Sequence, residues 1–337
     1  MDKRKLIPLG ILVIALVIYP YIQSKKTLQY VALSGKTMGP IVYNLKYADN
    51  KGMNYQKEVD SILVAFNQSM STYIPDSEIS QLNKSDTLTF QSEYFFPVLA
   101  ASKKIFDATK GAFDPTIGPI VNAWGFGPET RQEIDSLKID SLLTLVGFEK
   151  VRFNQKAVGK LTGAYIDFSA VAKGYAVDVL AQYLEGRGVD NYMVEIGGEV
   201  RSKGLNPDGQ NWRIGIENPQ GDELDRRLHA TVKLKDMAMA TSGNYRNFYE
   251  QDGKKYAHTI NPKTGYPVEH SLLSTSVFAP TCMTADAFAT AFMVMGLEKS
   301  LTMVNQLDSL DAYFIYADQN GVLKSLATAG IDSLISK

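Results

Sequence analysis

Asp286 and Thr290 are the two residues in this chain whose types and spacing point most directly to metal chemistry. Residues four apart project from the same face of a helix. Carboxylate and hydroxyl oxygens are hard donors that suit Mg²⁺. The spacing alone leaves a second interpretation open, in which Thr284 and Asp286 only cap the start of a helix.

His258 is one of three histidines in the sequence, and it begins a loop that Pro262, Gly265 and Pro267 would hold in a fixed shape. A neutral imidazole near pH 7 can accept a proton from a reacting hydroxyl. A lone histidine is more often a packed or surface residue, so the residue type alone leaves both roles open.

The segment from Asp167 to Gly174 is predicted to leave a strand and open a helix over 170–185, with Ser169 as the helix N-cap. Free N–H groups and the helix dipole favour an anion at such a start, and Lys173 adds a positive charge there. The alternative is a solvated lysine beside a capping aspartate. That alternative is weaker, because the dipole disfavours a cation at this end of a helix.

A tight turn is predicted at Gly197-Gly198-Glu199, between two strands. Its glycines would also let a flat ligand approach the backbone closely. Four aromatic residues could stack on such a ligand or belong to the core: Tyr73, Phe113, Trp124 and Tyr245.

The elements that must position these residues alternate between strands and helices along the chain. Apolar periodicity predicts helices over 55–70, 77–83, 94–109, 129–146, 170–185, 284–295 and 297–307. Strands are predicted over 41–45, 192–196, 199–203, 212–217, 229–235, 238–240, 246–251, 273–278, 312–316 and 322–325, with a hairpin over 151–167 and a loop over 111–128. This order predicts an α+β fold with largely antiparallel sheets and packed helices.

The composition excludes several classes of protein. With 337 residues, 45% hydrophobic and 21% charged, the chain has a globular composition, and its net charge of −1 gives no sign of a nucleic-acid surface. The single cysteine, Cys282, excludes an intrachain disulfide and a thiolate zinc cluster, and we predict that it is buried. The sequence has no P-loop, HExxH, GxSxG or helix-opening GxGxxG motif.

The N-terminus has the pattern of an export segment. The basic residues Lys3–Lys5 precede an apolar run over 6–22, and neither an Ala-x-Ala-like site nor a lipobox cysteine follows. We predict a signal anchor, or a cleaved signal peptide, over 1–24, a linker over 25–36 and one domain over 37–330. The expected location is the bacterial inner membrane, with the domain on the periplasmic side.

Taken in order, several segments resemble one family closely, the FAD:protein FMN transferases, or ApbE family. The resemblance spans roughly residues 30–330, and its most specific parts are Asp167–Tyr175 and His258–Thr290. The other matching segments are Met38-Gly39, Met70–Tyr73, Gly111–Thr116, Ile196–Glu199 and Thr241–Tyr245.

The resemblance implies an ApbE-like fold that binds FAD and Mg²⁺ and transfers FMN through a phosphoester bond to a threonine or serine of an acceptor protein, releasing AMP. The acceptor is expected to be an exported or membrane electron-transfer subunit. By position, the Mg²⁺ ligands would be Asp286, Thr290 and the backbone carbonyl of Ala170. The FAD contacts would be Met38, Tyr73, Ala112, Phe113, Asp114, Asp167, Lys173, Ile260 and Ala289. Catalysis would rest on His258, Asp286 and Lys173.

Two other functions stay open. The same site could hydrolyse FAD to FMN and AMP, with water in place of the acceptor, or the chain could bind flavin without turnover. Either His258 or Asp286 could take the proton of the incoming hydroxyl. The sequence also departs from the family at Asn261, where many relatives have aspartate, so a charge-based role is not expected there.

Overall fold

The computed structural model describes residues 28–127, 134–219, 228–244, 248–251 and 254–336. An eight-stranded sheet forms the centre, with the strand order β1-β2-β6-β7-β10-β13-β14-β15. Its strands are β1 (Gln29–Thr37), β2 (Ile41–Asp49), β6 (Tyr192–Ile196), β7 (Glu199–Lys203), β10 (Met237–Gly243), β13 (Leu272–Ala279), β14 (Asp311–Ala317) and β15 (Leu323–Ala327). All pairings between these strands are antiparallel, which confirms the predicted α+β class.

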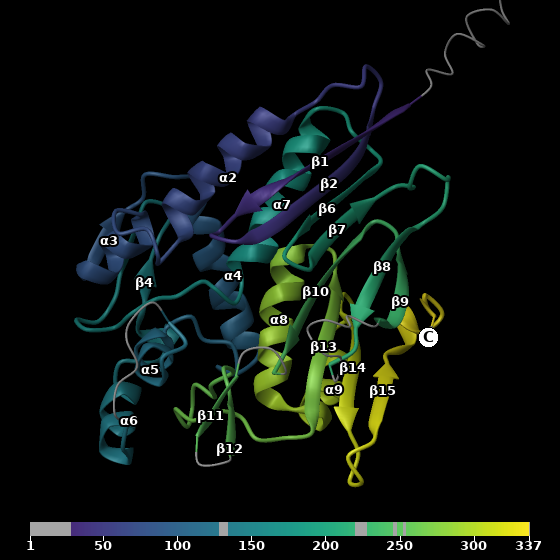
Figure 1. The fold of residues 1–337 in the computed structure, drawn as a ribbon. Helices are drawn as coiled ribbons and strands as arrows, with labels where there is room; N and C mark the ends of the chain where they lie inside the picture. Colours follow the sequence, from purple (N-terminus) through teal and green to yellow (C-terminus); the bar gives the residue numbers. More distant parts are fainter. Residues whose placement is uncertain (1–27, 128–133, 220–227, 245–247, 252–253, 337) are drawn as a thin grey trace, which may run out of the picture.

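Helices cover one face of this sheet and a small sheet packs on the other (Figure 1). The helices of the first layer are α2 (Gln56–Met70), α4 (Phe95–Ala108), α7 (Ala172–Gly186) and α8 (Cys282–Met295), followed by α9 (Leu297–Val304). On the opposite side, β8 (Trp212–Glu217), β9 (Leu228–Leu234) and β16 (Ile335–Ser336) form a three-stranded sheet. The main sheet is thus the middle layer of three.

Side-chain alternation in the central strands builds both cores. In β13, Val277 belongs to the core under the helices, whereas Phe278 belongs to the core under the small sheet. In β14, Phe314 and Ile315 divide in the same way. A period of two along a strand sends neighbouring residues to opposite faces, so central strands covered on both faces read as apolar runs.

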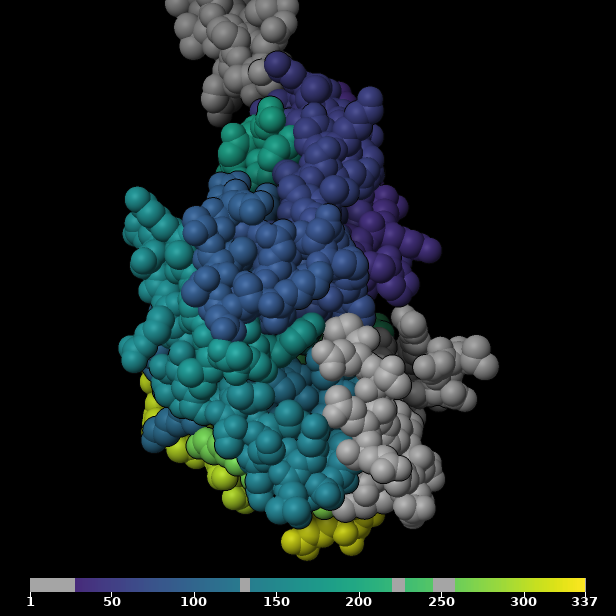
Figure 2. Space-filling model, turned by 90° about the vertical axis from the view of Figure 1, so that its left-hand side faces the viewer, coloured from purple at the N-terminus to yellow at the C-terminus, as the bar shows by residue number. Residues whose placement is uncertain are grey.

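The remaining elements lie beside α4, on the left of Figure 1. They are α3 (Glu78–Lys84), α5 (Gly118–Trp124), α6 (Ser136–Leu143), a 3₁₀ turn (Phe148–Lys150) and the small sheet of β3 (Thr87–Thr89), β5 (Ala157–Gly159) and β4 (Arg152–Phe153). Seen from that side, the blue residues of the α2 and α3 region lie above the teal residues of the α5 and α6 region (Figure 2). A hairpin of β11 (Phe248–Gln251) and β12 (Lys254–Ala257) and the short helix α10 (Ala329–Asp332) complete the fold.

The structure confirms most predicted helices to within a few residues at their ends, namely α2, α3, α4, α7, α8 and α9. The helix predicted over 129–146 is shorter: α6 begins after Asp135, whose carboxylate accepts a hydrogen bond from the Lys138 N–H. Of the hairpin predicted over 151–167, only β4 and β5 form, and the chain after Gly159 continues without strand structure.

Three predictions about element boundaries are wrong. The linker predicted over 25–36 is a strand from Gln29 onward, because β1 pairs with β2 along its whole length. The loop predicted over 111–128 contains α5, in which Pro119 stands in the first turn, where a missing N–H costs no helical hydrogen bond. Ser169 is not a helix cap: α7 starts after Val171, and the Ser169 hydroxyl donates to Asp167 instead.

The segment predicted to be a membrane anchor, over 1–24, lies outside the described residues. In the part of the chain that the structure describes, no helix combines the length and apolar character needed to span a bilayer. Cys282 is fully buried at the start of α8, as predicted.

Candidate active site

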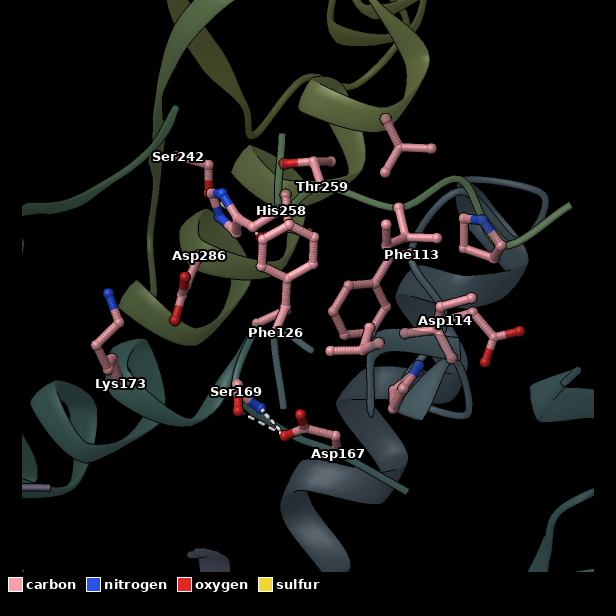
Figure 3. A pocket seen from close by; sticks show the side chains of 18 of the residues that line it. Phe113, Asp114, Phe126, Asp167, Ser169, Lys173, Ser242, His258, Thr259 and Asp286 are labelled. Carbon is pink, nitrogen blue, oxygen red and sulfur yellow. Dashed lines mark hydrogen bonds between the residues drawn. The ribbon is translucent and has the colours of Figure 1, made fainter. Parts of the chain in front are cut away.

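A cavity of about 920 Å³ opens where the starts of α7 and α8 meet the loops before α5 and after β12 (Figure 3). Its wall contains most of the residues that the sequence singled out. These are Tyr73, Ala112, Phe113, Asp114, Asp167, Ala170, Lys173, His258, Ile260, Asp286 and Thr290. The fold therefore brings segments from about 70 to 290 into one site.

Asp286 is held by a contact between two helices. The carboxylate is 4% exposed, and its Oδ2 accepts a hydrogen bond of 2.9 Å from the Gly174 N–H at the start of α7. The cap of α8 is Thr281, so the interpretation of Thr284 and Asp286 as mere capping residues is wrong. Burial raises the pKa of the Asp286 carboxyl, and the positive charge of Lys173 opposes that effect.

A second carboxylate makes the reciprocal contact between the same helices. Asp178 of α7 accepts hydrogen bonds from the backbone N–H groups of Cys282, at 3.0 Å, and Met283, at 2.8 Å. Arg201 of β7 donates to Asp178 at 2.8 Å. Free N–H groups at a helix start favour a carboxylate, so this contact fixes α8, and with it Asp286, against α7.

Thr290 follows Asp286 by one turn of α8, as predicted, and its hydroxyl lies 3.3 Å from the hydroxyl of Ser242 at the end of β10. Ala170 lies on the same cavity wall. The described residues contain no group of three or more His, Cys, Asp or Glu side chains arranged for a metal ion. The donors nevertheless fit Mg²⁺, which commonly binds one or two carboxylates and completes its shell with ligand phosphates and water. Ser242 belongs to the segment Thr241–Tyr245 that resembles the family, but its residue type alone predicts no role at the site.

Lys173 forms an ion pair of 2.8 Å with Glu199, the first residue of β7. The Glu199 side chain is 2% exposed and that of Lys173 is 29% exposed, so the interpretation of Lys173 as a solvated lysine is wrong. Burial lowers the pKa of Lys173, but the charges of Glu199 and Asp286 raise it above its usual value. Sequence reasoning missed Glu199 as a site residue, because nothing local distinguishes it from an ordinary strand residue after a hairpin turn.

Burial also dominates at Glu199 itself, where it raises the pKa of the carboxyl to about 7, against the opposing charge of Lys173. Its Oε2 is buried and has no hydrogen-bond partner among the described residues. The turn before it, Gly197-Gly198, is a tight hairpin with positive φ angles, as predicted.

The wall across the cavity from Lys173 is more apolar. Phe113 is 2% exposed and Ile260 is 5% exposed, and the Trp124 indole N–H donates to the Gly265 carbonyl at 2.9 Å. Tyr73 contributes to the cavity but is 69% exposed. A wall of buried apolar side chains with one exposed ring suits the flat, largely apolar ring system of a flavin or adenine.

His258 lies on the cavity wall with its ring 6.3 Å from that of Phe126. Figure 3 shows both side chains in the same part of the cavity as Asp286. Asp167 lies on the lower side of this view and accepts hydrogen bonds from the Ser169 N–H, at 2.8 Å, and hydroxyl, at 2.5 Å. The backbone N–H of Asp167 donates to Pro115, which links the two loops.

Two predicted FAD contacts are not on the cavity wall of the described residues. Met38 lies in the turn between β1 and β2, with a φ of 49°, and packs partly against the main core. Ala289 is fully buried in α8. Tyr245 falls outside the described residues.

The close approach of α7 to α8 gives a prediction at Gly174. A Cβ there would lie 2.3 Å from the Cys282 carbonyl oxygen and 2.8 Å from the Asp286 Cβ. Gly174→Ala should therefore push the helices apart and lower the free energy of unfolding by about 1–3 kcal/mol. Gly186→Ala is the matched control in the same helix, because no atom of the residues that the structure describes lies within 4 Å of its added Cβ. Urea unfolding of both variants checks this, and equal stability of the two would contradict it.

Asp114 gives a prediction about pH. Burial raises the pKa of its carboxyl from 3.8 to about 6, although hydrogen bonds from Thr116 oppose the shift. Between these values the folded state retains a proton that the unfolded state has lost, so this group's contribution to stability falls as the pH rises from about 4 to about 6. At about 1.4 kcal/mol per pKa unit, the change approaches about 3 kcal/mol.

Asp114→Asn should remove that slope, because asparagine does not titrate. The variant should thus gain stability relative to the wild type as the pH rises from about 4 to about 6, and the difference should then stay constant. Urea unfolding at several pH values measures it. A difference that is independent of pH would show that Asp114 is not protonated in the folded state.

Three comparisons with known proteins all match this chain to the same family. A family model described as the ApbE family matches residues 38–314. The FAD:protein FMN transferase of Vibrio cholerae is 39% identical over 322 residues, which cover 93% of this chain and 95% of the relative. That of Haemophilus influenzae is 39% identical over 341 residues, 97% of each chain. The solved structure of the flavin transferase ApbE from Vibrio cholerae matches with a TM-score of 0.81 and 38% identity, over 91% of this chain and 99% of that one.

Proposed function

The chain belongs to the ApbE family, and from that premise we propose that it transfers FMN from FAD to a hydroxyl of an acceptor protein. The observation that carries this proposal is that Lys173, His258, Asp286 and Thr290 all line one cavity of about 920 Å³. The side of the cavity that Phe113 lines, away from Lys173, is more apolar (Figure 3), so the cavity offers both a phosphate-binding side and a ring-binding side.

In the proposed reaction, the acceptor oxygen forms a bond to the FMN-side phosphorus of FAD. The bond from that phosphorus to the bridging oxygen breaks, and AMP leaves with the negative charge. The hydroxyl proton passes to His258 or Asp286. Phosphoryl transfer of this kind depends mainly on positioning and charge stabilisation rather than on a covalent intermediate.

Lys173 supplies positive charge on the phosphate side of the cavity, and the N-terminal end of the α7 dipole adds to it. Asp286, Thr290 and the carbonyl of Ala170 are the residues that would hold a Mg²⁺ ion. When bound, that ion would neutralise charge on the pyrophosphate and polarise the phosphorus. The acceptor residue is proposed to be a threonine or serine, because the reaction needs a free hydroxyl.

The test is a transfer assay with FAD, Mg²⁺ and a flavin-accepting protein. Covalent flavin on the acceptor is expected, together with an equal amount of AMP. Omitting the acceptor separates transfer from hydrolysis: a transferase should then release little AMP, whereas an FAD-hydrolysing enzyme should release it at the full rate. Flavin binding with no covalent product under any condition would support a non-catalytic flavin protein and overturn the proposal.

We further propose that the domain acts outside the cytoplasm, anchored by residues 1–24, on an exported or membrane electron-transfer subunit. The basic and apolar pattern of that segment supports this location. Alkaline phosphatase fused after residue 27 should be active in a bacterial host, because this reporter folds only after export. An inactive fusion with normal expression would argue for a cytoplasmic enzyme.

A further inference from the structure

Lys173 lies near two buried carboxylates but pairs with only one of them. Its ammonium is 2.8 Å from Glu199 Oε1, and in the described part of the chain it makes no ion pair with Asp286. Asp286 instead accepts from the Gly174 N–H. Each group still affects the other's charge state, since Lys173 lowers the pKa of Asp286 and Asp286 raises that of Lys173.

Burying the Glu199 carboxylate costs free energy, because its hydrogen bonds to water are lost and only partly replaced. Glu199 is 2% exposed, and its Oε2 is buried without a hydrogen-bond partner among the described residues. A buried carboxylate that is only half satisfied destabilises a protein unless a charge compensates it. Lys173 supplies that charge, and its ion pair offsets the cost of burying the Glu199 carboxylate.

The position of Glu199 is fixed by the backbone around it. It begins β7, directly after the turn in which Ile196 pairs with Glu199. Gly197 has a φ of 60°, and a Cβ there would lie 2.8 Å from Ile41 and 3.7 Å from Lys173 Cδ. The absence of a side chain at Gly197 thus lets the turn pack closely on Ile41, within contact distance of the Lys173 stem. A carboxylate on a paired strand is a rigid partner for a flexible lysine.

We propose that Glu199 is a positioning residue that holds the Lys173 ammonium away from Asp286 and thereby leaves the Asp286 carboxylate available to a divalent cation. The inference rests on the metal site of the proposed function and deepens it. Without Glu199, Asp286 is the buried carboxylate that lies in the same part of the cavity as Lys173 (Figure 3), and its charge already acts on the ammonium. An ammonium paired with Asp286 competes with a cation for the same oxygens, because both need the same negative charge in a site of low dielectric.

The test measures binding of Mn²⁺ alone, as a probe for the site, by electron paramagnetic resonance on the full chain without FAD or acceptor. Glu199→Ala should weaken Mn²⁺ binding by about tenfold or more, the size of effect seen when a partner of a metal ligand is removed. Glu199→Gln, which keeps the shape and an acceptor oxygen for Lys173, should weaken it less. Thermal unfolding of both variants checks that they are folded.

The deciding comparison removes the lysine. In a Lys173→Met background, Glu199→Ala should leave Mn²⁺ affinity unchanged within about threefold, because no ammonium remains to compete. If Glu199 attracted or bound the cation directly, the loss would persist in that background, and the proposal would be overturned. Wild-type affinity in Glu199→Ala would overturn it as well. Because the readout needs no flavin, failure of the transfer assay would leave this result separately interpretable.

Discussion

Asp286→Asn should reduce the rate of FMN transfer by about 10²- to 10³-fold, the loss expected when a charge-stabilising group is removed from a site of this kind. Asparagine keeps the size of the side chain and an oxygen that can accept from the Gly174 N–H, so the contact between α7 and α8 is retained. What it removes is the negative charge. A neutral amide binds Mg²⁺ far less well than a carboxylate does.

The expected measurement is the initial rate of covalent flavin formation as a function of Mg²⁺ concentration. The variant should need more Mg²⁺ than the wild type, while its affinity for the adenine and flavin rings of FAD falls much less. Glu298→Gln is a suitable control, because Glu298 is an exposed acid in the first turn of the neighbouring helix α9. Its rate should equal that of the wild type. A wild-type rate in Asp286→Asn would remove this residue from the metal site.

The sequence predicts the helix that carries Asp286, but it does not predict which residues contact Asp286. The apolar periodicity of 284–295 placed Asp286 and Thr290 on one face of a helix, and the structure agrees. The contact with Gly174 spans 112 residues of sequence, and no local pattern records it. The capping interpretation stayed open for the same reason: Thr281, Thr284 and Asp286 are all polar residues near a helix start, and only the hydrogen bonds distinguish the cap from the site residue.

The sequence misses the role of Glu199 and predicts a role for Ser169 that it does not have, and both errors have one physical cause. Glu199 reads as a strand residue after a Gly-Gly turn, yet a charge from α7 pairs with it in the folded chain. Ser169 has the residue type of an N-cap, but Asp167 accepts its hydroxyl and the helix starts later. In both cases a local preference is overridden by a partner that tertiary structure or an adjacent turn provides. The central strands are easier to predict from the sequence. They are buried on both faces, so apolar residues follow one another along the strand.

His258→Ala should lower the rate of transfer by about 10²- to 10⁴-fold, the range typical of a lost general acid or base. The imidazole lies on the cavity wall beside Phe126, on a loop whose turn contains Gly265 with a φ of 74°. A Cβ at Gly265 would lie 2.5 Å from Ile139, so this turn packs closely against α6. Mn²⁺ binding should be unchanged, because His258 is not among the proposed ligands.

Imidazole added to His258→Ala distinguishes the two candidate bases. If His258 takes the proton of the incoming hydroxyl, the cavity left by the missing ring should admit free imidazole, and the rate should rise with its concentration. The rate of Asp286→Asn should not change with imidazole, because the His258 ring still occupies the space that free imidazole would enter. If Asp286 takes the proton and His258 only positions the phosphate, imidazole should leave the rates of both variants unchanged. A rate in His258→Ala within about threefold of the wild type would exclude both roles for His258. Three measurements therefore distinguish the roles of these residues. The role of Asp286 is tested by the Mg²⁺ concentration that its variant needs, that of Glu199 by whether its effect depends on Lys173, and that of His258 by rescue with imidazole.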